Sequence, residues 1–130
     1  MAIYNVEEFL DEAITSIIDQ ALDFEHHIQL ILVNDGSVDA SGEICFKYKE
    51  AYPENIVFID KENGGASSAR NEGLKYAKGK YINFLDPDDT LSPSTLLKVY
   101  DFFEKNYSKV DVVSIPMMMF GKTSGPHLLN

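Results

Sequence analysis

Helix-like and strand-like segments alternate along this chain, and the alternation restricts the folds that it can adopt. Residues 5–22 carry apolar side chains spaced three and four apart, which is the spacing of one helix face. Residues 28–34 are instead short and apolar, as in a buried strand. The predicted elements are, in order, helix 5–22, strand 28–34, helix 41–52, strand 56–60, helix 66–79, strand 80–85, helix 92–106 and strand 110–115.

This order predicts an α/β fold with a mostly parallel sheet and helices on both of its faces. In such sheets, ligands bind beyond the carboxyl ends of the strands. Polar loops follow three of the predicted strands, and they begin at Asp35, at residue 62 and at Asp86. We therefore expect these loops to open on one edge of the sheet.

The loop at residues 86–89 contains a candidate metal site. Asp86 and Asp88 are separated by one proline, so their carboxylates point the same way in an extended segment. Two carboxylates at a strand end form part of a site for Mn²⁺ or Mg²⁺, which would share oxygens with a diphosphate. The same residues are also typical of a turn before a helix, with Asp89 or Thr90 as the helix cap. The motif alone leaves both interpretations open.

The other polar segments contain candidates for nucleotide binding. The Asp35 carboxylate could accept hydrogen bonds from a base or a ribose, or it could belong to an ordinary Asp-Gly turn. Arg70 lies about one turn into the helix after a glycine-rich loop. Its guanidinium could bind a phosphate, pair with Asp86 or be an ordinary surface group. Tyr4 could stack on a base or pack in the core.

Several local features carry their own predictions. Asn5 can cap the first helix, with Glu8 completing a capping box, and Gly79 can end the helix that starts at residue 66. The single cysteine, Cys45, has no partner for an internal disulfide and is expected to be a packing residue. The tail at residues 117–130 has mixed signals and is assigned little structure.

The composition excludes some classes of protein. A formal net charge of −10 repels phosphate backbones, so nucleic-acid binding is not expected, whereas a surplus of carboxylates suits a divalent cation. No apolar run approaches the ~20 residues that span a bilayer, and no signal-peptide pattern is visible. We expect a cytoplasmic chain, with a peripheral place at the inner face of the membrane left open.

Taken together, three stretches resemble the N-terminal, nucleotide-sugar-binding half of family 2 glycosyltransferases of the GT-A fold. They are IYNVEEFLDEAITSIIDQ, IQLILVNDGSVDASGEI and NGGASSARNEGLKYAKGKYINFLDPDDTLSPSTL. The resemblance extends to about residue 115 and agrees in order, spacing and loop contents. It implies a Rossmann-like GT-A sandwich that acts on a nucleoside-diphosphate sugar.

The resemblance also implies roles for the candidate residues at the base. The loop at Ile3, Tyr4 and Asn5 would hold the nucleotide base, with Tyr4 near its ring. Asp35 would hydrogen-bond the base, which in this family is most often uracil. The implied donor is therefore a UDP-sugar.

A second group of residues is implied at the diphosphate. Arg70 would support the pyrophosphate or the acidic loop. Asp86 would contact the ribose or the metal, and Asp88 would coordinate Mn²⁺ or Mg²⁺. The implied reaction is inverting transfer of the sugar to a hydroxyl of a carbohydrate or lipid-linked acceptor.

Two features depart from the family pattern. The hydrophobic first strand is largely missing, and Ala2 stands where a proline is expected, which indicates a truncation or residues supplied by another chain. No residue matches the family's general base, an Asp or Glu of the acceptor half. We therefore expect residues 1–115 to bind the donor, residues 116–130 to begin a truncated acceptor half, and this chain alone to transfer sugar poorly or not at all.

Two other functions and one assembly state are compatible with the sequence. The alternatives are a nucleotidyltransferase-like enzyme and a non-catalytic nucleotide-sugar-binding module. An incomplete sheet edge would also favour a homo-oligomer.

Overall fold

A computed structural model of the protein describes residues 1–115, 117–119 and 125–127. Two compact units divide the chain between Leu97 and Lys98, within the helix α5 (Thr95–Asn106). All the candidate site residues lie in the first unit, Met1–Leu97. Among the described residues, no helix has both the length and the apolar character needed to cross a membrane.

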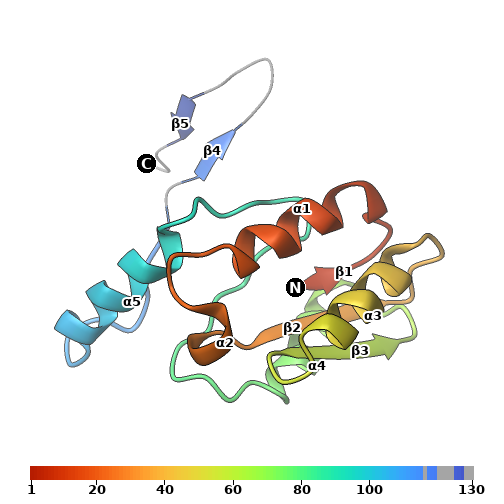
Figure 1. The fold of residues 1–130 in the computed structure, drawn as a ribbon, viewed down its shortest axis with the longest axis horizontal. Helices are drawn as coiled ribbons and strands as arrows, with labels where there is room; N and C mark the ends of the chain where they lie inside the picture. Colours follow the sequence, from red (N-terminus) through yellow and green to blue (C-terminus); the bar gives the residue numbers. More distant parts are fainter. Residues whose placement is uncertain (116, 120–124, 128–130) are drawn as a thin grey trace. The chain divides into compact units, whose positions relative to one another are not determined.

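A parallel three-stranded sheet forms the centre of the first unit (Figure 1). The strands β1 (Ala2–Ile3), β2 (Leu30–Asp35) and β3 (Ile56–Lys61) lie in the order β1-β2-β3. β2 pairs with β3 along its whole length, whereas β1 pairs with β2 over two residues only. The predicted parallel sheet is confirmed, and so is the prediction that its first strand is largely missing.

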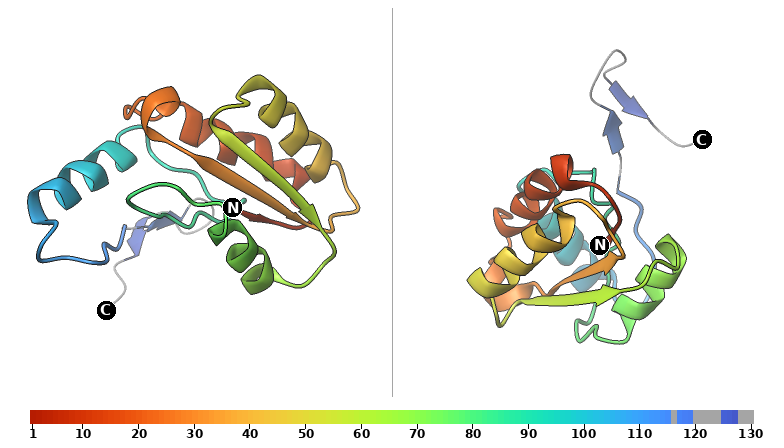
Figure 2. Two further views of the ribbon diagram at one scale, coloured as in Figure 1. Left: turned by 90° about the horizontal axis from the view of Figure 1, so that it is seen from below. Right: turned by 90° about the vertical axis from the view of Figure 1, so that its right-hand side faces the viewer.

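Helices cover both faces of this sheet, as predicted. α1 (Glu7–Ile18) and α3 (Ser41–Ala51) lie on one face, and α4 (Ala66–Leu74) lies on the other (Figure 2). A short helix that the sequence pattern did not predict, α2 (Phe24–His27), precedes β2. The side chain of Asp23 caps it by accepting a hydrogen bond from His26 N.

The side chains of β2 alternate between the two helical layers, as expected for a strand covered on both faces. Leu30 and Leu32 belong to the core beneath α1 and α3. Val33 faces α4 so closely that a Cβ added to Gly73 would lie 3.2 Å from Val33 Cγ2. The interior glycine of α4 therefore permits the close approach of this helix to the sheet.

The N-termini of α1 and α3 cap each other. Val6 N donates to Ser41 Oγ, Glu7 N donates to Asp39 Oδ2, and Ala40 N donates in return to Glu7 Oε2. The prediction that Asn5 caps α1 is wrong, since Val6 occupies the cap position and makes no side-chain cap bond. Asn5 instead adopts a φ of +50° and accepts a hydrogen bond from Val38 N.

The predicted strands at residues 80–85 and 110–115 are absent from the structure, which leaves both segments irregular. A strand is stable only where a neighbouring strand satisfies its backbone groups. The strand pairs of the described residues give neither segment a neighbour, and β1 offers an edge of only two residues. Ile82 and Phe84 accordingly remain more than half exposed.

Two other boundaries differ from the sequence-based expectation. α4 ends at Leu74 instead of Gly79, with Lys75 N and Tyr76 N bonded back to the last turn. In the second unit, the tail that was assigned little structure contains β4 (Met117–Met119) paired antiparallel with β5 (Gly125–His127). Residues 116, 120–124 and 128–130 of the predicted tail lie outside the described residues.

Cys45 packs in the core, as predicted, and its side chain has no exposed surface. Burial raises the pKa of the Cys45 thiol to about 12, so the reactive thiolate is scarce at neutral pH. We expect a thiol reagent such as 5,5′-dithiobis(2-nitrobenzoic acid) to label the folded chain very slowly and the urea-unfolded chain completely. Rapid labelling of the folded chain at pH 7 would contradict this packing.

Candidate functional site

The loops that follow the three strands lie against one another at the carboxyl edge of the sheet. Asn5 N donates to Ser37 Oγ at 3.1 Å, which joins the loop after β1 to the loop after β2. Asn63 Nδ2 donates to the backbone carbonyl of Asp35 at 2.9 Å, which joins the loop after β2 to the loop after β3. Two of the three polar loops that were expected on one edge, those at Asp35 and at residue 62, therefore meet there.

Asp35 is the buried centre of this edge, with a residue exposure of 2%. Its carboxylate accepts hydrogen bonds from Lys61 Nζ at 2.6 Å, from Gly65 N at 2.7 Å and from Gly64 N at 3.0 and 3.1 Å. Burial alone would raise the pKa of Asp35, but these donors outweigh it and hold the pKa below its ordinary value. Asp35 therefore stays ionised and fixes the glycine-rich loop.

These contacts limit how the Asp35 carboxylate could bind a nucleotide base. The carboxylate is already shared among one ammonium and two backbone N–H groups. Binding of a base at Asp35 stays a prediction, and it would require the base to join or replace one of these donors. Lys61, which pairs with Asp35, was not identified from the sequence, although it lies at the end of the strand that pairs with β2.

The acidic loop is connected to α4 by an ion pair. Arg70 Nη2 lies 2.6 Å from Asp86 Oδ1, so one of the pairings expected for Arg70 is observed. The two side chains are 40% and 55% exposed, and at such exposure the pair contributes little to stability. Its main consequence is positional, since it brings the third polar loop to the helix that follows the glycine-rich loop.

Residues 86–89 form a turn, in which Asp89 N donates to the carbonyl of Asp86 at 3.1 Å. Asp89 and Thr90 lie well before α5 begins at Thr95, so neither of them caps that helix. Burial, followed by the negative charges of Asp88 and Asp86, raises the pKa of Asp89. The turn therefore concentrates carboxylates that repel one another.

This crowding suits a cation, although the protein side chains alone do not complete a metal site. Within residues 1–115, no group of three His, Cys, Asp or Glu side chains is close enough to hold a metal ion. Asp88 is exposed, and Asp86 already accepts from Arg70. Mg²⁺ characteristically takes one or two protein carboxylates and completes its shell with water and phosphate oxygens. Asp86 and Asp88 fit that kind of site.

Ile3 and Tyr4, the two candidates near the start of the chain, differ in how far their side chains are exposed to solvent. The side chain of Ile3 is completely buried, so only its backbone can face a ligand. Tyr4 is 50% exposed beside the loop after β2, and its side chain is not part of the core. Of its two interpretations, core packing is wrong, and stacking on a base stays a prediction.

Known proteins resemble this chain in sequence and in fold. A family model described as "Glycosyl transferase family 2" matches residues 1–127. The minor teichoic acid biosynthesis proteins GgaB and GgaA of Bacillus subtilis are 55% and 43% identical to this chain over 130 residues. The chain spans only 14% of GgaB and 29% of GgaA.

A solved structure of similar fold contains a bound nucleotide. The crystal structure of Staphylococcus aureus TarS 1–349 in complex with UDP has a TM-score of 0.75 and 26% sequence identity to this chain. The match covers 93% of this chain and 38% of the TarS chain.

Proposed function

Since the chain belongs to the glycosyl transferase family 2, we propose that it forms the part of a glycosyltransferase that binds a UDP-sugar. The predicted fold class is confirmed by the match to TarS, which has the GT-A type of sandwich. The observation that carries the proposal is the clustering of the loops after β1, β2 and β3 at one sheet edge, in a fold whose relative TarS binds UDP.

Each predicted residue has a part in this proposal. The exposed ring of Tyr4 would stack on uracil, with the backbone of Ile3 and the carboxylate of Asp35 nearby. Arg70 would bind the diphosphate, which requires it to leave or to share Asp86. The fixed loop at Gly64 and Gly65 keeps the N-terminus of α4 in position beside these groups.

We propose that Asp86 and Asp88 hold Mn²⁺ or Mg²⁺ together with the diphosphate. When bound, such an ion would stabilise the negative charge of the departing diphosphate. The chain's own contribution is to orient the two carboxylates through the turn and to keep Asp86 in place through Arg70. An ion would also relieve the repulsion from Asp88 and Asp86 that, after burial, raises the pKa of Asp89.

The rest of the proposal concerns the whole enzyme. We propose inverting transfer to a hydroxyl of a carbohydrate or lipid-linked acceptor, with the general base supplied by residues outside this chain and little transfer by this chain alone. The relatives named for teichoic acid biosynthesis support an acceptor of the cell-envelope polymer class. We further propose a cytoplasmic location at the inner membrane face and a homo-oligomer formed at the short β1 edge.

The metal role gives a prediction that calorimetry can check. We expect UDP to bind the chain more tightly with Mn²⁺ than with a chelator, because an ion held by Asp86 and Asp88 would offset the negative charge of the diphosphate. Asp88→Ala should abolish this difference and leave only the weaker, metal-independent binding.

A matched control is Asp101→Ala, which removes an exposed carboxylate of α5 and should leave the Mn²⁺ dependence intact. Undiminished metal dependence in Asp88→Ala would show that the ion is held elsewhere. Failure of UDP to bind under either condition would count against the donor-binding function itself.

A further inference from the structure

β3 lies at the edge of the sheet and presents unpaired backbone groups on its outer side. Leu30 N donates to the carbonyl of Asn55 at 2.9 Å, so the backbone carbonyl of Asn55 faces β2. In a parallel ladder, the backbone groups of every second residue face the same partner strand. Phe58 and Asp60 lie an odd number of positions from Asn55, so their N–H and C=O groups point away from β2. Among the described strands, none pairs with this side of β3.

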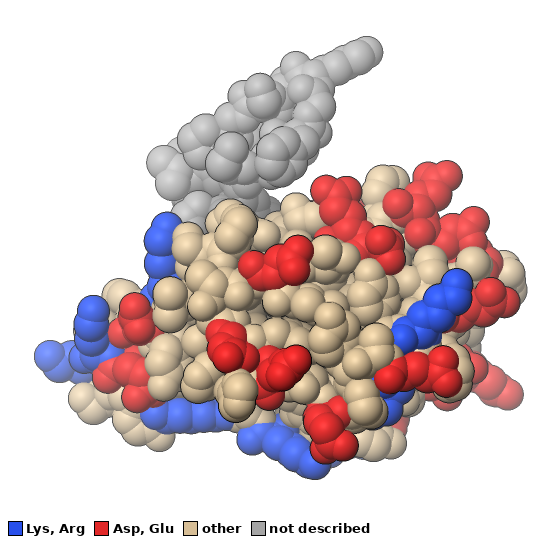
Figure 3. Space-filling model, viewed as in Figure 1, with Lys and Arg blue, Asp and Glu red and all other residues tan. Residues whose placement is uncertain are grey.

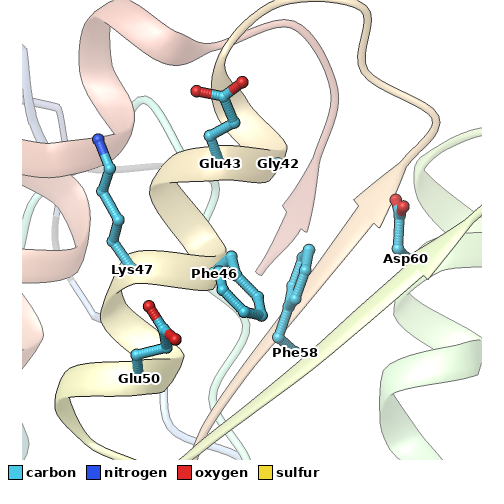
Figure 4. Close-up of a pocket in the computed structure, with 7 residues that line it drawn as sticks. All are labelled: Gly42, Glu43, Phe46, Lys47, Glu50, Phe58 and Asp60. Atoms are coloured by element: carbon cyan, nitrogen blue, oxygen red, sulfur yellow. The ribbon is translucent and has the colours of Figure 1, made fainter.

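An open hollow of about 480 Å³ runs beside this edge, between β3 and α3. Phe58 of β3 and Phe46 of α3 line it, and their rings point toward one another (Figure 4). Phe46 is 52% exposed, which is high for a phenylalanine. The free backbone edge and the aromatic hollow therefore belong to the same surface.

The charge around the hollow is mostly negative. Glu43, Glu50 and Asp60 line it, against a single cation, Lys47. Asp60 is held in place, since Asn34 Nδ2 donates to its Oδ1 at 2.8 Å. Acidic side chains also outnumber basic ones over the face of the molecule seen in Figure 3. A guanidinium stacks on aromatic rings and pairs with carboxylates, so arginine fits this combination best.

We propose that the outer edge of β3 and the Phe46–Phe58 hollow dock an extended, basic segment of a partner protein. The segment would add a strand to β3, with an arginine between the two phenylalanines and a second basic residue two positions along, beside Asp60. Backbone hydrogen bonds would supply affinity, and the alternate side chains would supply specificity. A second copy of this chain is a poor occupant, because it would bring the same carboxylates to the same edge.

A peptide titration followed by NMR tests this docking surface. The probe is the acetylated and amidated peptide Thr-Val-Arg-Val-Lys-Val-Thr, and its counterpart carries Glu in place of Arg and Lys. We expect the basic peptide to shift the amide signals of Phe58 and Asp60 and to slow their hydrogen exchange. The acidic counterpart should do neither.

Charge-reversal variants show whether the hollow is responsible. Glu43→Lys with Glu50→Lys should weaken peptide binding by about tenfold or more, because both carboxylates line the hollow. Glu8→Lys with Glu12→Lys changes the net charge equally on α1 and should change the affinity less than about twofold. Equal weakening in both pairs, or no response of the Phe58 and Asp60 amides, would overturn the proposal. So would shifts of these amides that depend on protein concentration without peptide, since they would identify a second copy as the occupant.

Discussion

Asp35→Ala is expected to lower the free energy of unfolding by about 3 kcal/mol at pH 7. The substitution removes the acceptor for the N–H groups of Gly64 and Gly65 and the charged partner of Lys61 Nζ, which keeps only its hydrogen bond to the carbonyl of Glu62. Asp35 is 2% exposed and Lys61 only 21% exposed, so water cannot fully replace the lost partner. Removing one member of a buried pair costs more than the pair itself contributes.

Urea denaturation measures this effect, and two variants serve as controls. Asp101→Ala, which removes an exposed carboxylate on α5, should change the unfolding free energy by less than about 0.5 kcal/mol. In Asp35→Ala with Lys61→Met no ammonium is left unpaired, so the double variant should be more stable than Asp35→Ala alone. An Asp35→Ala protein as stable as the parent would mean that the glycine-rich loop is not held by this carboxylate.

The effect of Asp35→Ala should also depend on pH. The folded-state pKa of Asp35 lies below the ordinary value of 3.8, so its ionised form stabilises the fold. That contribution is fully present above the unfolded-state pKa and is lost as the pH falls through the folded-state pKa. The difference in stability between the parent chain and Asp35→Ala should therefore stay constant above the unfolded-state pKa and shrink as the pH falls below it.

The predictions from sequence succeeded where local pattern and burial coincide. The ends of four elements lie within four residues of their predicted positions, because the apolar spacing of each element reflects the layer that it packs against; these elements are β2, β3, α1 and α3. Residues 80–85 also carry apolar side chains, at Ile82, Phe84 and Leu85, yet they form no strand. A strand needs a neighbour, and that requirement is not visible in the segment itself.

In the candidate site, too, some contacts were predicted from the sequence and others were not. The pairing of Arg70 with Asp86 was one of the alternatives predicted for Arg70, because the glycine-rich loop before its helix and the acidic loop were expected at the same edge of the sheet. The contact between Lys61 and Asp35 was not foreseen, since it depends on the register that places these two residues opposite each other. Asn5 was misjudged because a cap can also be supplied by residues more than thirty positions away, as Ser41 and Asp39 do for α1.

Gly36→Ala is expected to be the second most damaging substitution, with a loss of about 2–3 kcal/mol of unfolding free energy. Gly36 has a φ of +73°, which is unfavourable for any residue with a Cβ. A Cβ at this position would also lie 2.8 Å from the backbone nitrogen of Asn63, so the loop after β3 would have to move. That loop contains the glycine N–H groups bound by Asp35, and its displacement would disturb the candidate nucleotide site as well.

Thermal or urea unfolding checks this loss, and Gly79→Ala is the matched control. Gly79 lies in an exposed loop, and its φ is outside the range that favours glycine. A Cβ at Gly79 would lie 3.2 Å from the carbonyl oxygen of Tyr81, but no unfavourable backbone angle is involved in this exposed segment, so the substitution should cost less than about 1 kcal/mol. Equal losses of stability in the two variants would mean that the close packing of the loops after β2 and β3 does not depend on Gly36. If Gly36→Ala alone loses both stability and UDP binding, the two loops act as one structural unit that supports the proposed donor site.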